Sequence, residues 1–174
     1  MQLIQATPEH LEETAALMEQ VKDALTVQGI FQWDETYPSR DFLHEAIRDG
    51  NLYVFTVDGA IIGSVVLDEW QAPEWDAINW QETESPVLVI HALAIEPRLH
   101  GRGYGSTLLR ACEQLASEHS YGCLRLDVFA GNPAARGLYE RHGYQQRGQI
   151  QFQSKPTGYQ AYACYEKNLL ELAP

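Results

Sequence analysis

The feature that most constrains this chain is an apolar run that leads directly into a glycine-rich turn. Residues 87–95 read Val-Leu-Val-Ile-His-Ala-Leu-Ala-Ile, and apolar side chains at both odd and even positions predict a strand buried on both faces of a sheet. Glycines follow at 101, 103 and 105, and apolar side chains then recur at helical spacing. A strand, a turn and a helix in this order predict a parallel crossover.

The remaining pattern predicts a mixture of strands and helices. Strands are expected at residues 2–6, 52–57, 60–67, 123–128, 144–152 and 159–168, and helices at 7–25, 39–50, after the glycine turn, and 132–143. The 174 residues amount to about one domain of ordinary size. We therefore expect a single domain over residues 1–174 with an α/β (mixed α+β) fold, in which a central mixed sheet of about seven strands is flanked by helices on both faces.

The charge of the chain is acidic and unevenly distributed. The net charge is −12, with 17 acidic and three basic side chains in residues 1–86 and seven acidic and nine basic side chains in residues 87–174. An acidic surface repels phosphate backbones, which excludes nucleic acid as a partner. The acidic half either meets a cationic or neutral ligand or serves only to keep the protein soluble.

Three further observations concern location and metals. No apolar run approaches the length of a membrane span, and the N-terminus lacks the pattern of a secretory signal. The three cysteines cannot all pair and show no CxxC spacing. We expect a cytoplasmic protein that binds no membrane and no metal.

The glycine turn is suited to binding an anion. Glycines let successive backbone N–H groups point into one concavity, and the following helix adds unpaired donors and partial positive charge. Arg98, His100 and Arg102 would supply side-chain donors nearby. The GxxxxGK[ST] phosphate loop is absent, and GxGxxG fails because Ser106 holds its last position. The alternative is a tight turn that only allows close helix packing.

Two motifs together resemble the GNAT-type N-acetyltransferase superfamily. Residues 98–103, Arg-Leu-His-Gly-Arg-Gly, have the form [RQ]xxGx[GA] of the family's acetyl-CoA pyrophosphate motif and follow an apolar strand, as they do there. Residues 126–144 resemble the second signature, a strand followed by Asn-x-x-Ala and Leu-Tyr-x-x-x-Gly-Tyr. The resemblance implies the GNAT fold, with substrate-side helices in residues 1–50 and the acetyl-CoA-binding core in residues 86–143.

The resemblance also implies a cofactor site for acetyl-CoA as cosubstrate. Its residues would be Leu93, Ala94, Ile95, Arg98, Gly101, Arg102, Gly103, Tyr104, Gly105, Ser106, Asn132 and Tyr139. A backbone N–H at or near Leu93 would polarise the thioester carbonyl, while the side chains of Leu93 and Ile95 are expected to pack in the core. Asn132 would cap a helix, contact the cofactor, or do both. Tyr139 would protonate the leaving thiolate, or it is a buried aromatic on a short helix.

The general base has three candidates. His91 is the one titratable side chain in the central strand, although a lone strand histidine is more often a hydrogen-bonded core residue. Asp127 alternates with apolar neighbours in the next strand, and Glu69 ends an earlier one. No cysteine stands in a nucleophile setting, so a covalent acetyl-enzyme is disfavoured and direct attack in a ternary complex is expected.

The acceptor is expected to be a small-molecule amine. Trp33, Tyr37, Glu69 and Trp70 belong to segments that mix aromatic and acidic side chains, which would suit a cationic amine unless the aromatics only pack the loops onto the sheet. Two other hypotheses remain: a non-catalytic CoA-binding sensor or interaction protein, and a protein N-terminal or lysine acetyltransferase. The resemblance also makes a homodimer an expectation.

Overall fold

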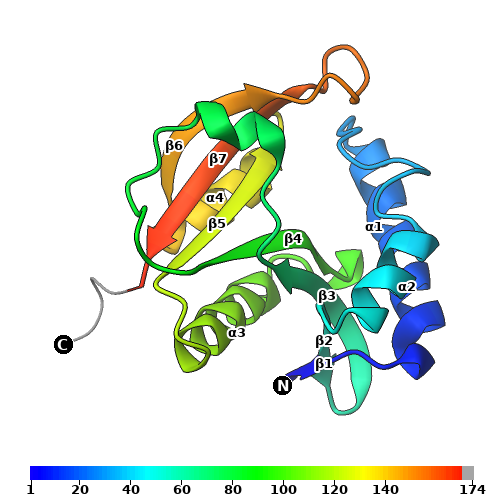
Figure 1. Cartoon of the computed structure of the whole chain (residues 1–174). Helices are drawn as coiled ribbons and strands as arrows, with labels where there is room; N and C mark the ends of the chain where they lie inside the picture. The colour runs from blue at the N-terminus through cyan, green and yellow to red at the C-terminus, as the bar shows by residue number, and fades with distance from the viewer. Residues whose placement is uncertain (170–174) are drawn as a thin grey trace. The chain divides into compact units, whose positions relative to one another are not determined.

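The computed structural model describes residues 1–169, and its elements follow the predicted order (Figure 1). The α-helices are α1 (Leu11–Val27), α2 (Arg40–Arg48), α3 (Tyr104–Glu118) and α4 (Pro133–Arg141). The strands are β1 (Gln2–Gln5), β2 (Leu52–Val57), β3 (Ala60–Asp68), β4 (Val87–Ile95), β5 (Cys123–Phe129), β6 (Gln145–Gln151) and β7 (Ala161–Asn168). Short 3-10 helices are η1 (Pro8–His10), η2 (Pro73–Ala77) and η3 (Pro97–Leu99). The strand order is β1-β2-β3-β4-β5-β7-β6, which confirms the predicted mixed sheet.

The described residues group into two compact units, and each unit is discontinuous in sequence. Unit 1 contains Met1–Leu67 and His91–Cys112, and unit 2 contains Asp68–Ile90 and the chain from Glu113 onward. Strand β4 and helix α3 therefore each contribute residues to both units. The predicted site residues are also divided between them.

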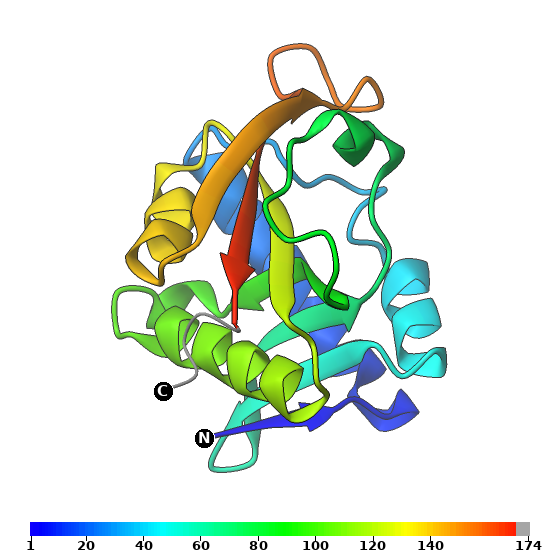
Figure 2. The ribbon, with the colours of Figure 1, turned by 60° about the vertical axis from the view of Figure 1, so that its left-hand side comes forward.

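Unit 1 holds α1 and α2 on one face of β1–β3 and the first turns of α3 on the other (Figures 1 and 2). Met18, Leu43, Leu52 and Val54 are fully buried in the core between the helices and the strands, because the apolar stripe of each helix faces the sheet. The Ser39 hydroxyl accepts the Phe42 N–H at 3.1 Å, so α2 begins at the cap that the sequence predicts.

A two-residue turn joins β2 to β3. Asp58 and Gly59 have φ angles of 51° and 85°, so both central residues are left-handed, as a type I′ hairpin requires. Gly63 in β3 serves a different purpose, because a Cβ there would lie 2.7 Å from the Ala94 carbonyl oxygen and from Ile95 Cδ1. Glycine therefore permits β3 to pack closely against the end of β4.

Unit 2 is built on an antiparallel sheet of β5, β7 and β6, to which the start of β4 adds in parallel. The parallel pairing joins residues 87–89 to residues 123–125, which confirms the predicted crossover. Helix α4 covers one face of the sheet, and residues 69–86, which we name the strap, cover the other (Figure 2). The strap includes η2 and lies close to β6, since a Cβ on Gly148 would approach Ile78 Cδ1 to 2.7 Å.

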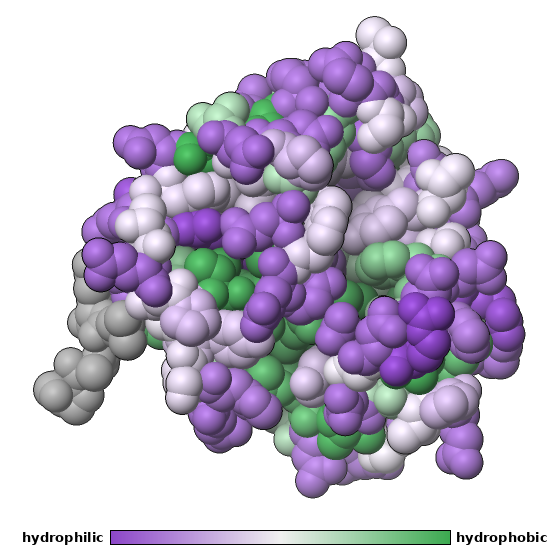
Figure 3. Space-filling model, in the orientation of Figure 1, coloured by the Kyte–Doolittle hydropathy of each residue, from purple (hydrophilic) through white to green (hydrophobic). Residues whose placement is uncertain are grey.

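Hydrophilic side chains cover most of the face that Figure 3 shows, with apolar side chains exposed in small patches. The large apolar side chains exposed among the described residues are Met1, Ile4, Val27, Phe31 and Trp70. Within residues 1–169, every helix is too short or too polar to cross a bilayer.

Candidate functional site

The glycine turn in unit 1 prepares the N-terminus of α3 for an anion. Gly101 and Gly103 have φ angles of 76° and 84°, the left-handed region that glycine enters without strain. The Thr107 N–H donates to the Gly103 carbonyl at 3.0 Å, so the amides of residues 104–106 precede the helical ladder. The first turn carries no acidic side chain. These amides and the helix dipole therefore present partial positive charge with no carboxylate of that turn to neutralise it.

The basic side chains around this turn differ in their contacts. Arg98 is 83% exposed and donates from Nε to the Glu96 carboxylate at 2.7 Å, so its positive charge is partly neutralised by Glu96. A ring nitrogen of His100 lies 2.9 Å from the Ile95 carbonyl oxygen and ties the turn to the end of β4. Arg102 is exposed. The backbone is therefore the more fixed part of this anion site.

Strand β4 is irregular where the thioester contact is predicted. Ala92 has a φ of 47°, a left-handed conformation that is uncommon for a residue with a side chain. Ala94 and Ile95 are buried as expected, and Leu93 is half-buried. The left-handed residue interrupts the alternation of the strand just before Leu93.

Three other predicted residues of unit 1 lie outside the turn. His91 is half-buried in β4. Trp33 and Tyr37 pack partly buried against the core of unit 1, and the Tyr37 ring lies 4.9 Å from that of Phe42. Both aromatics therefore pack against the core of unit 1, and their contact with an acceptor stays a prediction.

In unit 2, Asn132 and Tyr139 belong to α4. Asn132 Oδ1 accepts the Ala135 N–H at 3.1 Å, which confirms the predicted cap. Tyr139 is 7% exposed, and its ring packs edge-on against Tyr144 with a centroid distance of 5.7 Å and tilted against Tyr165 at 6.3 Å. The aromatic body of Tyr139 is thus a core element, whether or not its hydroxyl also serves the reaction.

Asp127 is hydrogen-bonded to the strap. Its Oδ2 accepts the Trp75 indole N–H at 3.0 Å, and the Trp75 side chain is 2% exposed. Glu69 accepts the Tyr121 hydroxyl at 2.8 Å, and Trp70 is 61% exposed. Of the predicted residues of unit 2, Asp127 is therefore held by a buried partner, whereas Trp70 faces outward.

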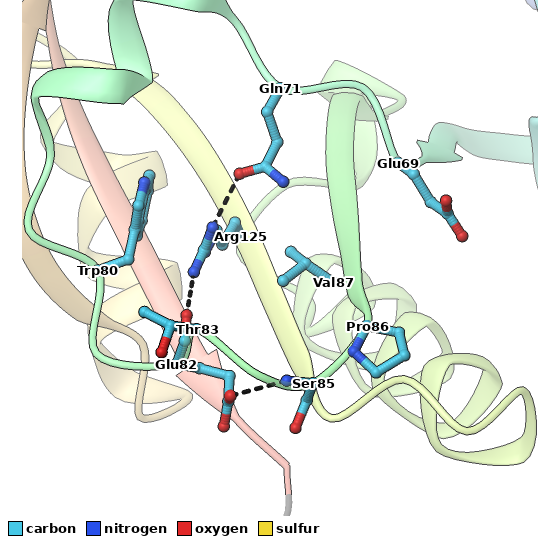
Figure 4. Close-up of a pocket in the computed structure, with 9 residues that line it drawn as sticks. All are labelled: Glu69, Gln71, Trp80, Glu82, Thr83, Ser85, Pro86, Val87 and Arg125. Atoms are coloured by element: carbon cyan, nitrogen blue, oxygen red, sulfur yellow. Dashed lines mark hydrogen bonds between the residues drawn. The ribbon is translucent and has the colours of Figure 1, made fainter.

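A pocket of about 440 Å³ lies between the strap and the start of β4 and β5 (Figure 4). The residues that line it are Glu69, Gln71, Trp80, Glu82, Thr83, Ser85, Pro86, Val87 and Arg125. Glu82 accepts the N–H groups of Ser85 and Glu84 at 2.9 and 2.7 Å, which lowers the pKa of its carboxyl group. The pocket thus carries a carboxylate that stays ionised at a lower pH than an ordinary glutamate does.

Arg125 also lines this pocket, and the sequence analysis did not predict it as a site residue. It is buried, its guanidinium lies 4.3 Å from the ring centroid of Trp80, and its Nη1 donates to Gln71 at 2.8 Å. Its Nη2 lies 3.2 Å from Glu166 Oε1 and also contacts the Glu82 carbonyl. The sequence signal was a charged residue inside an apolar strand. One aromatic face of the strap, that of Trp80, is therefore occupied by a cation of the chain itself.

The three cysteines are buried. Burial raises the pKa of both Cys123 and Cys164 to about 12, with the Glu166 charge contributing at Cys123 and the Asp127 charge at Cys164. Neither thiol forms a thiolate near neutral pH, which agrees with the prediction that no cysteine is a nucleophile. Among residues 1–169, no cluster of three or more His, Cys, Asp or Glu side chains is arranged for a metal ion.

The comparisons with known proteins agree with the motifs. The model of the acetyltransferase (GNAT) family matches residues 17–144. The chain is 28% identical over 148 residues to YesJ of Bacillus subtilis, described as an uncharacterized N-acetyltransferase, covering 82% of this chain and 81% of YesJ. Its fold is similar to a GNAT-family acetyltransferase from Streptococcus agalactiae (TM-score 0.81, 23% identity, 96% and 94% coverage). It is also similar to the ribosomal-protein-S18-alanine N-acetyltransferase of Escherichia coli (TM-score 0.70, 14% identity, 97% and 93% coverage). The match over most of its length shows that this chain belongs to the GNAT family of acetyltransferases.

Proposed function

We propose that this protein transfers the acetyl group of acetyl-CoA to the primary amine of a small molecule. The observation that carries the proposal is the N-terminus of α3, where two left-handed glycines precede helix amides with no acidic side chain in the first turn. A diphosphate is the group that such amides and such a dipole favour. The resemblance of residues 98–103 to the family's pyrophosphate motif supports the CoA pyrophosphate as that group.

The reaction we propose is direct attack of the amine on the thioester. The N–C bond forms as the C–S bond breaks, the amine loses a proton to a base, and the thiolate gains one from Tyr139. The backbone N–H at Leu93 would donate to the carbonyl oxygen as it becomes negative. The base is one of His91, Asp127 and Glu69. The raised pKa values of Cys123 and Cys164 support transfer without an acetyl-enzyme.

The pocket in unit 2 supports a small cationic acceptor. Its volume of about 440 Å³ falls in the range of small-molecule sites. Glu69 and Glu82 line it, and both carboxylates are held by hydrogen bonds, from the Tyr121 hydroxyl and from backbone N–H groups respectively. Fixed carboxylates attract a protonated amine, which the acidic balance of residues 1–86 also favours.

Titration calorimetry with CoA, followed by a thiol-release assay with acetyl-CoA and a panel of amines, tests this function. We expect heat on binding of CoA, an affinity that falls with salt, and thiol release with at least one small amine, whose N-acetyl product is identified by mass spectrometry. The absence of binding heat would overturn the proposal. Binding without thiol release on any acceptor would indicate a CoA sensor, and acetylation of protein acceptors alone would indicate a protein acetyltransferase.

A further inference from the structure

The hydrogen bond between Trp75 and Asp127 joins a buried indole to a candidate base. Trp75 lies in η2 of the strap, and its Nε1 donates to Asp127 Oδ2 on β5 at 3.0 Å. Trp75 is 2% exposed, so this bond forms in a setting where water competes little. An indole has one donor and no acceptor, so the contact is compatible only with a carboxylate oxygen that accepts.

Trp75 is itself held by the residues around it. Its ring lies 5.1 Å from that of Trp80 at an interplanar angle of 53°, and Trp80 in turn stacks on the Arg125 guanidinium at 4.3 Å. Arg125 forms an ion pair with Glu166, whose side chain is 1% exposed. The contact between Trp80 and Arg125 joins the strap to the sheet, and the contact between Trp75 and Trp80 extends this anchoring to the Trp75 indole.

Glu166 anchors the strap at a second point. Its Oε2 accepts the Gln81 N–H at 3.0 Å and the Arg147 Nε at 2.9 Å, and its Oε1 accepts the Glu82 N–H at 3.3 Å. One carboxylate thus satisfies two strap amides and two arginines. Hydrogen bonds to the sheet therefore hold the strap on both sides of Trp80, in addition to the packing of its aromatic side chains.

The charged and titratable groups around Asp127 lie on β5, β7 and the strap. Cys164 lies opposite Asp127 on β7 and is a neutral thiol at ordinary pH, since its pKa is raised to about 12. Position 148 of β6, which pairs with Cys164, is a glycine. The Arg125–Glu166 pair lies two residues along the same strands, and Glu74 and Asp76, which flank Trp75 in the strap, are exposed.

We infer that Trp75 is a positioning residue that holds the Asp127 carboxylate, ionised and in one orientation, as the general base of acetyl transfer. This inference rests on the proposed function. A donated hydrogen bond favours the charged form of a carboxylate, and a base acts only when it is held within reach of the proton that it removes. If Trp75 served only to anchor the strap, phenylalanine would lose part of its packing but cause no loss of base function.

The first test needs no substrate. The four indole N–H groups of the chain give separate signals in an ¹⁵N-correlation NMR spectrum, and the Trp75→Phe variant identifies one of them. We expect the Trp75 signal to move as pH is lowered through the titration of Asp127, and to lose this movement in Asp127→Asn. A Trp75 signal that is insensitive to pH in the wild type would overturn the hydrogen bond and the inference with it.

The second test is kinetic, with the amine that the panel identifies. We expect Trp75→Phe to lower kcat about 10-fold, through loss of orientation, with little change in KM and with the acid limb of the pH–rate profile displaced to higher pH. In the Asp127→Asn background the same substitution should have no further effect on kcat. Trp80→Phe is the matched control, in which KM for the amine can change but the acid limb stays in place.

The outcomes distinguish this inference from the proposed function. If Trp75→Phe lowers the melting temperature but leaves the acid limb unmoved, Trp75 is an anchor only. If Asp127→Asn retains full turnover, the base lies elsewhere, and the inference fails while acetyl transfer stands. If the wild type transfers acetyl to no amine, the proposed function fails whatever the NMR titration shows.

Discussion

Gly103 and Gly59 have nearly the same φ angle, 84° and 85°, in the left-handed region, and a Cβ on either would meet no other atom within 4 Å. Gly103 lies at the start of α3 and Gly59 in a hairpin turn, both in unit 1. A comparison of alanine variants at the two positions therefore separates the energetic cost of a strained backbone from the loss of an anion site.

We predict that Gly103→Ala and Gly59→Ala lower the free energy of unfolding by a similar amount, about 1 kcal/mol, because alanine is strained in the left-handed region. Only Gly103→Ala should weaken CoA binding, by about 10-fold, since relaxation of the strain turns an N–H away from the phosphate. Denaturant titration and calorimetry measure the two effects. Equal CoA affinities in the two variants would contradict a role for this turn in binding.

We predict that Tyr139→Phe lowers turnover about 100-fold, because a positioned acid is lost, and that CoA affinity is almost unchanged. Tyr165→Phe is the control, since that hydroxyl accepts from Arg136 at 3.1 Å and donates to Glu140 at 2.7 Å. We expect this control to lose about 1 kcal/mol of stability with turnover retained. Full turnover in Tyr139→Phe would remove the phenol from the mechanism.

We predict that Glu166→Gln destabilises the fold by about 3 kcal/mol, because Arg125 and Arg147 would be left without their shared carboxylate in a buried place. The exposed pair between Glu12 and Arg40 is the comparison, and Glu12→Gln should leave stability unchanged within error. Chemical denaturation of the two variants measures the difference. Equal stability would indicate that the strap is held by its aromatics rather than by the charge network.

We predict that the native protein reacts slowly with a thiol reagent at pH 8, while the unfolded chain reacts at all three cysteines. The raised pKa values of Cys123 and Cys164 mean that the folded state keeps these protons while the unfolded state loses them above about pH 9. Their contribution to stability is complete below pH 9 and decreases as pH rises from there toward 12. Rapid labelling of a folded sample would contradict this burial.

Local signals in the sequence predicted most of the fold. The Asp-Gly dipeptide at 58–59, the caps at Ser39 and Asn132, and the apolar run at 87–95 each determine a conformation through groups close in the chain. The left-handed conformation of Ala92 carries no such signal, because alanine ordinarily avoids it. It was therefore not anticipated.

The contacts of the strap were not predictable from the sequence for a different reason. Trp75 meets Asp127 across 52 positions, and Trp80 meets Arg125 across 45. Aromatic and acidic composition predicted attraction for a cationic ligand, but composition does not distinguish a cation in a ligand from one in the chain itself. Only the fold identifies Arg125 as the partner of Trp80.

The burial of every native sulfhydryl makes the unmodified protein a convenient host for spectroscopy. A single cysteine introduced at an exposed position such as Val27 would be the one site that a spin label or fluorophore reaches quickly. The label could then be attached without first replacing the three natural cysteines, and the labelled protein would keep its native core.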